Sequence, residues 1–190
     1  MGIFDKLKGH VGAQFLDIIE WTTDDQELVA WKFPIFNQAI QDGGQLVVRE
    51  GQAAVFIQEG KLSEVFAPGT YELSTNTPAI TSFFDSIAYQ FNYPFKGDVY
   101  FFSTKRFANQ GWGTQNPIIY NAEGFGGLEL RAYGHYDFKI IDPATFLREV
   151  VSTESVVNAS AVTGKLRSKL VSAFADMLNE SQLALEKVMG

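Results

Sequence analysis

The most regular alternation of apolar and polar positions lies in the second half of the chain, between Leu128 and Ile140. Every second residue there is apolar or small, and the residues between them are polar or charged apart from Tyr133. A period of two over this length predicts a β-strand with one face on a core and the other in water. The inward set is Leu128, Leu130, Ala132, Gly134, Tyr136, Phe138 and Ile140.

A series of short strands is expected earlier, between Leu28 and Tyr120, where short apolar runs are separated by Gly, Pro, Asn and Asp. The runs "AAVFIQ" and "KLSEVF" flank Glu59-Gly60, which predicts a two-residue hairpin. Pro68-Gly69 suits a type II turn, because proline fixes one central φ angle and glycine accepts the positive φ of the other. With "TYELS" as the next strand, residues 50–73 predict a three-stranded meander.

The period becomes helical after Asp142. Asp142 is a favourable N-cap residue and Pro143 suits the first helical position, so a helix is expected over "ATFLREVV". A longer helix is expected from about Thr153, with an apolar residue on one side at every fourth position. That apolar stripe is Leu166, Leu170, Phe174 and Leu178. The basic residues Lys165, Arg167 and Lys169 lie off the stripe and predict a solvated face.

The first 21 residues predict an amphipathic helix, because their apolar residues fall within one arc at about 100° per residue. The arc comprises Ile3, Phe4, Leu7, Val11, Phe15, Ile18 and Ile19. Gly9 and Gly12 weaken an isolated helix, so it is expected to form against a partner surface. Docking on this chain or a neighbouring subunit and contact with a membrane are both open, because the pattern does not separate them.

Composition narrows the class of protein. Aromatic residues make up 14% of the chain, which favours strands over a helical bundle. A net charge of −7 argues against a duplex nucleic-acid surface, because such binding depends on neutralising phosphates. The chain has no cysteine, which excludes a disulfide framework and a thiol nucleophile and fits a reducing compartment. No apolar run approaches the roughly 18 residues of a membrane-spanning helix, so a soluble or surface-bound protein is expected.

Few residues offer catalytic chemistry. The glycine-rich stretch Gly124–Gly127 precedes an alternating strand pattern, whereas a phosphate-binding loop opens a helix, so a connection or hairpin is expected. His135 has Tyr133 and Asp137 on the same predicted strand face, where a small polar cluster or a solvated surface could form. No spacing of His, Asp and Glu points to a metal, and no cofactor is expected. Trp21, Trp31 and Trp112 are expected to be core or interface anchors.

The chain resembles the SPFH superfamily, which comprises stomatin, prohibitin and flotillin and is also called band 7. The resemblance rests on "LVVREGQAAVFIQEGKL", "FAPGTYEL" and "RAYGHYDFKIIDPATFLREV", and it spans about residues 28–180. These are turns and strands that specify a fold and carry no catalytic signature. The chain also looks like the bacterial branch called virion-core-protein-like, in which a segment reading like "MGIFDKLKGH…EW" precedes the domain.

The resemblance implies an α+β fold: a curved, mostly antiparallel sheet with C-terminal helices, preceded by the N-terminal amphipathic helix. The expected organisation is an amphipathic segment over residues 1–21, an SPFH domain over 22–180, and the tail of the last helix over 181–190. Members of the superfamily act as membrane-associated, oligomerising scaffolds, and the bacterial branch is linked to membrane stress. Two departures are the absence here of the cysteine-rich zinc ribbon and of the membrane anchor that many relatives carry.

Two hypotheses of different classes follow. The first is a non-enzymatic cytoplasmic scaffold that forms homo-oligomers and is recruited to the inner face of the membrane through residues 3–19. The alternative is a soluble ligand-binding or enzymatic module that uses Tyr133, His135 and Asp137. The alternative requires a deep pocket lined by these three side chains, whereas the scaffold requires none.

Overall fold

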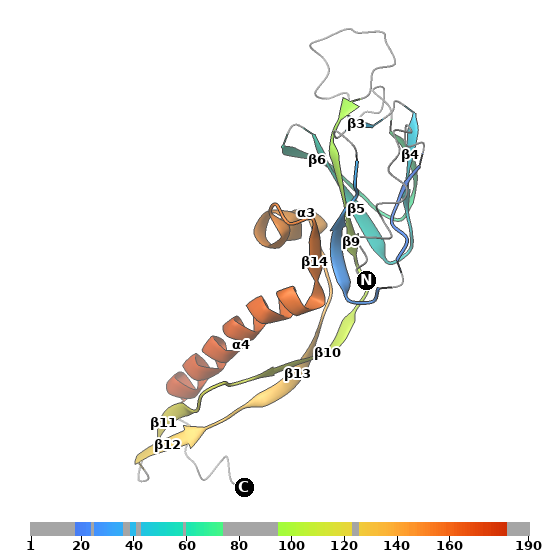
Figure 1. Cartoon of the computed structure of the whole chain (residues 1–190). Helices are drawn as coiled ribbons and strands as arrows, with labels where there is room; N and C mark the ends of the chain where they lie inside the picture. Colours follow the sequence, from blue (N-terminus) through green and yellow to red (C-terminus); the bar gives the residue numbers. More distant parts are fainter. Residues whose placement is uncertain are drawn as a thin grey trace, which may run out of the picture. The chain divides into compact units, whose positions relative to one another are not determined.

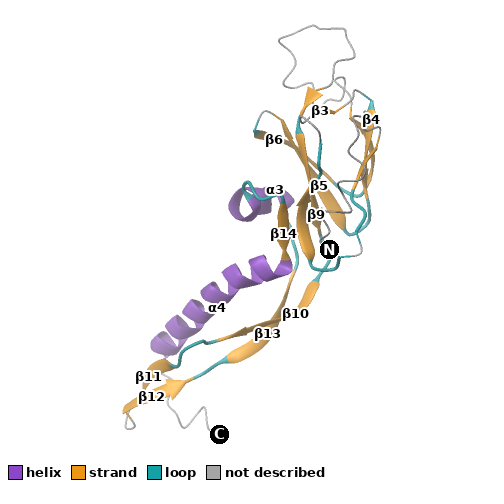
Figure 2. Ribbon diagram, in the orientation of Figure 1, coloured by secondary structure: helices purple, strands orange, loops and turns teal. Residues whose placement is uncertain are grey.

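The computed structural model describes residues 18–23, 25–35, 39–40, 43–58, 60–73, 95–122 and 126–181. These fall into two compact units (Figures 1 and 2). Unit 1 takes the described residues up to Lys105 together with Ile140–Val157, and unit 2 takes Arg106–Lys139 and the described residues from Asn158 onward. The chain passes between the units at 105/106, 139/140 and 157/158, with no linker-like stretch at any of them. Composition therefore gave no sign of the division.

Unit 1 contains two main sheets. The five-stranded sheet has the order β14-β2-β9-β5-β6, and the three-stranded sheet has the order β1-β4-β7. β1 pairs with β4 in parallel, whereas β4 with β7, β5 with β6, and β9 with both β2 and β5 are antiparallel. The strands are β1 (Ile18–Glu20), β2 (Leu28–Lys32), β3 (Ala39–Ile40), β4 (Gly44–Val48), β5 (Gln52–Gln58), β6 (Lys61–Phe66), β7 (Gly69–Leu73), β8 (Phe95–Lys96), β9 (Asp98–Ser103) and β14 (Val156–Asn158).

The five-stranded sheet is covered on both faces. One face shares a core with the three-stranded sheet, and Phe56 and Phe101 are fully buried there. The opposite face carries Phe102, whose ring meets that of Phe146 edge-on at 6.1 Å. Phe146 ends the short helix α3 (Pro143–Phe146), which packs on β5 and β6 and continues into the π-helix η3 (Leu147–Val151). Burial on both faces explains why β5 and β9 are almost continuously apolar.

The stretch 50–73 follows the sequence prediction only in part. β5 and β6 form the expected hairpin, with Gln58 opposite Lys61 and a positive φ of 77° at Gly60. The three-stranded meander is wrong, because β7 pairs with β4 in the other sheet. The predicted type II turn is also absent: Gly69 has φ 156°, far from the roughly +80° of that turn. The Pro68-Gly69 corner transfers the chain between sheets.

Unit 2 is a two-stranded antiparallel ribbon with one long helix. The ribbon pairs β10 (Phe107–Gly113) with β13 (Tyr133–Phe138) and β11 (Ile118–Ala122) with β12 (Gly126–Leu130). The alternation predicted for Leu128–Ile140 is confirmed, since its apolar or small members are at least partly buried and the others are exposed. Two strands replace the single long one, joined at Ala132, whose N–H donates to Thr114 Oγ1 and whose carbonyl accepts from Thr114 N.

The predicted helix start at Asp142 is confirmed. Its carboxylate accepts hydrogen bonds from Thr145 N at 3.0 Å and Thr145 Oγ1 at 2.7 Å, and Pro143 follows at the first helical position. These two bonds, the one from the backbone first, lower the pKa of Asp142. The second helix starts later than predicted: residues from Val156 first form β14, and α4 runs Ala159–Ser181. Val156 and Val157 are β-branched, which suits a strand at the sheet edge.

Three consecutive cross-strand pairs of the ribbon join a glycine to a ring: Gly111 with His135, Trp112 with Gly134, and Gly113 with Tyr133. A Cβ atom at Gly134 would lie 2.9 Å from Trp112 Nε1, closer than real contacts allow. Gly134 is therefore the position that leaves room for the edge of the Trp112 indole. The alternation places Trp112 on one face and the His135 and Tyr133 rings on the other.

Candidate functional site

Residues 18–20, at the end of the segment predicted as an amphipathic helix, form the strand β1. Ile18 and Ile19, which the sequence placed on an amphipathic helix, belong to β1 and pair with Gln45 and Leu46 of β4. Ile19 is only 1% exposed in the core, so in this fold its side chain contacts protein. The helical interpretation is wrong at these two residues, because two adjacent isoleucines suit a strand as well as a helix. The other members of the arc, Ile3, Phe4, Leu7, Val11 and Phe15, lie outside the described residues.

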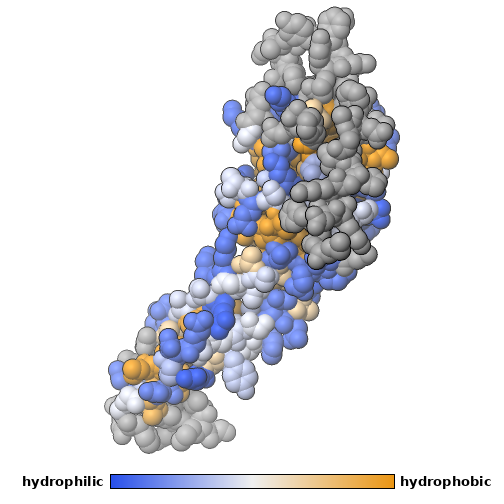
Figure 3. Space-filling model, in the orientation of Figure 1, coloured by the Kyte–Doolittle hydropathy of each residue, from blue (hydrophilic) through white to orange (hydrophobic). Residues whose placement is uncertain are grey.

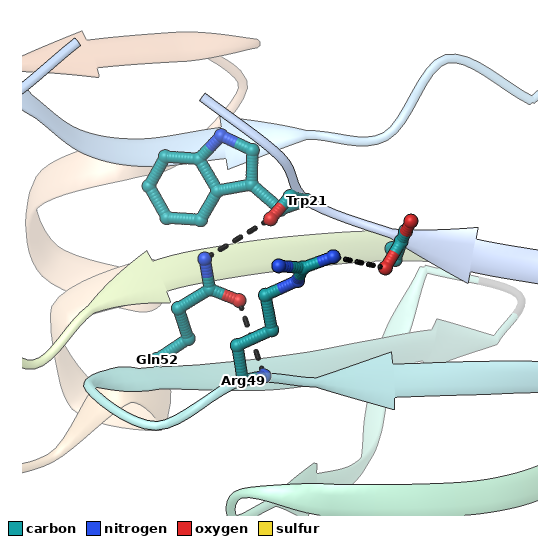
Figure 4. A network of polar contacts seen from close by, with 4 residues as sticks. Trp21, Arg49 and Gln52 are labelled. Atoms are coloured by element: carbon teal, nitrogen blue, oxygen red, sulfur yellow. Dashed lines mark hydrogen bonds and ion pairs between the residues drawn. The ribbon is translucent and has the colours of Figure 1, made fainter. Parts of the chain in front are cut away.

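A polar network joins the end of β1 to Arg49 and Gln52, at the connection between β4 and β5 (Figure 4). Arg49 Nη2 lies 3.0 Å from Glu20 Oε2, and Gln52 Nε2 donates to the carbonyl of Trp21 at 3.1 Å. Gln52 Oε1 in turn accepts from the backbone N–H of Arg49 at 3.3 Å. The Trp21 ring is buried and stacks on Trp31 at 6.3 Å. The C-terminal end of β1 is thus fixed within unit 1 by the ion pair at Glu20 and the hydrogen bond to the Trp21 carbonyl.

The three side chains of the alternative hypothesis lie on the outer face of the ribbon. Tyr133 is 88% exposed, and His135 and Asp137 are exposed too. Asp137 Oδ1 accepts from Asn109 N at 2.9 Å and Oδ2 lies 3.5 Å from Arg106 Nη1, so this carboxylate serves the β-bulge at Asn109. The deep pocket that an enzymatic role would require is not formed by these three side chains. Their exposure agrees with the other interpretation, that this strand face is a solvated surface.

The opposite face of the ribbon carries α4. Trp112 meets Phe174 of α4 with ring centroids 6.0 Å apart, and Leu178 is buried with Tyr120 of β11. The α4 stripe predicted from the sequence therefore packs on the ribbon. The expectation that Arg167 is solvated is wrong, because its Nε and Nη2 both donate to the carbonyl of Gly113 at 3.2 Å.

A second polar contact lies one turn earlier along α4. Thr163 Oγ1 donates to Gln110 Oε1 at 3.0 Å, across a separation of 53 residues. Together with Arg167, Thr163 sets the position of the helix along β10, since each contact joins one helical turn to one residue of the strand. The Trp112 and Phe174 rings supply the apolar part of the same interface. Figure 3 shows mainly hydrophilic and intermediate residues along the visible face of α4.

Unit 1 holds two groups of partly buried polar side chains. Lys32 Nζ lies 2.9 Å from Asp98 Oδ2 and 5.6 Å from the centroid of the Tyr100 ring. Burial raises the pKa of the Tyr100 phenol; the Lys32 charge opposes this rise and the Asp98 charge adds to it. On β6, burial raises the pKa of Glu64, whose Oε2 is enclosed without a hydrogen-bond partner. In the first group the Lys32 ammonium is paired with the Asp98 carboxylate, which is an ordinary structural ion pair.

Within the ranges that the structure describes, no three His, Asp or Glu side chains are grouped so that they could hold a metal ion. No helix among those residues is long and apolar enough to cross a membrane. The described side chains offer packing surfaces, ion pairs and exposed faces.

Comparison with known proteins identifies the class. The model of the SPFH domain–Band 7 family matches residues 30–190, and the chain belongs to that family. It is similar to an uncharacterized protein of Bacillus subtilis strain 168, YdjI, with 29% identity over 143 residues. That match covers 74% of this chain and 43% of YdjI, so the chain spans less than half of its relative. No solved structure matches the chain.

Proposed function

We propose that this chain is a non-enzymatic scaffold that forms homo-oligomers and attaches to the inner face of the cytoplasmic membrane, where it takes part in membrane organisation or the response to membrane stress. The observation that carries the proposal is membership of the SPFH–band 7 family over residues 30–190, since proteins of this family are generally membrane-associated scaffolds. The domain organisation proposed is a membrane-contacting segment before β1, followed by the SPFH domain.

The way β1 is held in unit 1 supports this proposal. β1 begins at Ile18, and the network of Glu20, Arg49 and Gln52 ties it to unit 1. A contact made by the residues before Ile18 would therefore act on a folded, anchored strand. The proposed contact residues are Ile3, Phe4, Leu7, Val11 and Phe15. Ile18 is 54% exposed at the start of β1 and extends this set.

Co-sedimentation with liposomes of anionic and of neutral lipid tests the membrane contact. The sharpest variant is Phe4→Asp with Leu7→Asp, which places two charges on the apolar arc and is expected to abolish pelleting with the vesicles. A truncation should remove residues 1–17 only, because Ile19 and Trp21 belong to the core and their loss would unfold unit 1.

The matched control is Gly9→Asp with Ala13→Asp, which adds the same two charges on the opposite side of the predicted helix. This control is expected to pellet like the unmodified chain. If the chain fails to bind either vesicle, or if both double variants bind equally well, the membrane contact proposed for residues 3–15 is wrong. Light scattering after size-exclusion chromatography measures the assembly separately, and a monomer at all concentrations would contradict the scaffold.

A further inference from the structure

The face of α4 that points away from the ribbon carries four charged residues and one serine in a regular order. Lys165, Lys169, Ser172, Asp176 and Glu180 follow one another at intervals of four, three, four and four residues, and all five are exposed. At about 100° per residue they fall within roughly 80° of one another, so they form one stripe along the helix. We call these five residues the charged stripe. It is distinct from the inward contacts of Arg167 and Phe174.

The order of these charges is unfavourable within a single helix. Asp176 and Glu180 are like charges four residues apart, and this pair repels. The opposite charges nearest to each other, Lys169 and Asp176, are about 10 Å apart along the axis, two turns rather than one. The helix has no acidic residue in its first turn and no basic residue in its last turn, so the order does not serve the macrodipole either.

The charged stripe is basic at its N-terminal end and acidic at its C-terminal end, so it is complementary to a second copy that runs in the opposite direction. The midpoint of Lys165 and Glu180 and the midpoint of Lys169 and Asp176 coincide between Ser172 and Ala173. A second α4 running antiparallel across that point would place Glu180 of the second copy opposite Lys165 and Asp176 of the second copy opposite Lys169. A two-fold axis repeats each contact, which is how isologous interfaces are built. Ser172 and Ala173 are small and exposed, so the helix axes can approach closely there.

We propose that α4 pairs with α4 of a second copy of this chain, antiparallel and centred between Ser172 and Ala173. This inference rests on the proposed function, because it names the surface through which the scaffold assembles. The occupant is a second copy because the stripe matches its own reversed sequence of charges. Asp176 and Glu180, which repel each other within one helix, each lie opposite a lysine of the second copy.

Cysteine cross-linking tests the geometry, since the chain has no cysteine of its own. Ser172→Cys places a thiol next to its equivalent at the crossing point, and mild oxidation is expected to give a covalent dimer on a non-reducing gel. Ala161→Cys lies on an exposed position of the same side, where the two thiols would be about 34 Å apart in an antiparallel pair. No dimer is expected from it. A dimer from Ala161→Cys would indicate parallel helices and overturn the proposal.

Charge reversal tests the energetics in the full chain. Lys169→Glu replaces two attractions of the pair with two repulsions and is expected to weaken dimerisation roughly tenfold in sedimentation equilibrium at low salt. Asp176→Lys is expected to do the same, and the two substitutions together should restore the dimer. Lys139→Glu, an exposed residue after β13 with the same change in net charge, is the control and should leave the dissociation constant unchanged.

The outcomes separate this inference from the proposed function. An assembly that persists in both single reversals, together with no cross-link from Ser172→Cys, would overturn the α4 pairing and leave the scaffold in place. A chain that is monomeric at every concentration would overturn both. Single reversals that dissociate the dimer and a double reversal that restores it would support the pairing, since a merely structural role of Lys169 would not be rescued by a second substitution.

Discussion

The two units bury their apolar side chains in different ways. In unit 1 a five-stranded sheet is covered by a second sheet on one face and by α3 and η3 on the other, so residues such as Phe56 and Phe101 have no exposed surface. In the described residues of unit 2 a two-stranded ribbon has α4 on one face, and the side chains of its other face are exposed. An isolated two-stranded ribbon is marginally stable at best, so the stability of unit 2 depends on α4.

The two units therefore differ in role: unit 1 is built around a closed core, and unit 2 presents exposed faces. Unit 1 buries most of its apolar residues in its own core, with Ile18, Val65 and Ile141 left 54%, 41% and 84% exposed. Unit 2 leaves one face of the ribbon and one face of α4 open to solvent. Ile119, Tyr133 and Met177 are large apolar side chains of unit 2 that are 66%, 88% and 51% exposed. The surfaces available for assembly in the described residues of unit 2 are therefore extended faces rather than a pocket.

The largest effect is expected from the core of unit 1. Phe101 is fully buried against Trp21, Trp31 and Phe33, so Phe101→Ala should lower the free energy of unfolding by about 3–5 kcal/mol, a loss comparable to the whole stability of many domains. Urea unfolding followed by tryptophan fluorescence measures it. Tyr133→Ala is the matched aromatic control, and its exposed ring should change stability by less than about 0.5 kcal/mol. Equal losses of unfolding free energy in the two variants would contradict the distinction between the closed core of unit 1 and the exposed faces of unit 2.

A smaller and more local effect is expected at the helix of unit 2. Phe174→Ala removes the ring that meets Trp112 and should cost about 2–3 kcal/mol, less than a core phenylalanine because Phe174 is only partly buried. Hydrogen exchange should show α4 amides exchanging faster while those of β5 and β9 keep their protection. Met177→Ala, on the exposed side of the same helix, should leave α4 protected. Uniform loss of protection in both units would show that α4 does not open by itself.

Features set by neighbouring residues could be predicted from the sequence. Asp142 and Pro143 define a helix start within four residues, Gly60 allows the tight β5–β6 hairpin, and the alternation after Leu128 follows from the two faces of one strand. Strand partners could not be predicted in the same way. The run "TYEL" alternates identically whether it pairs with β6 or with β4, and only packing in three dimensions places it on β4.

Part of the candidate site could also have been found. Arg167 precedes Leu170 by three residues and Phe174 by seven, so it shares their side of the helix, and this spacing predicts an inward position. Its acceptor, the carbonyl of Gly113, is 54 residues away and could not be found from spacing. The secondary structure of Ile18 and Ile19 could not be predicted, because a short apolar pair fits a helix and a strand equally well.

The smallest effect is expected at the edge of the five-stranded sheet, where Glu64 lies opposite the buried Phe56. Burial raises the pKa of Glu64 above its ordinary value of 4.5, so the folded chain keeps this proton to higher pH than the unfolded chain. The ionised side chain therefore costs stability as pH rises through that raised pKa. Glu64→Gln should make the chain slightly more stable at pH 7, with a gain that shrinks toward pH 4, in urea titrations at the two pH values. Glu50→Gln, an exposed residue of the same unit, should show no gain at either pH. A gain for Glu64→Gln of equal size at both pH values would mean that lost charge is not its cause, and that the enclosed Oε2 is costly whether or not the group is ionised.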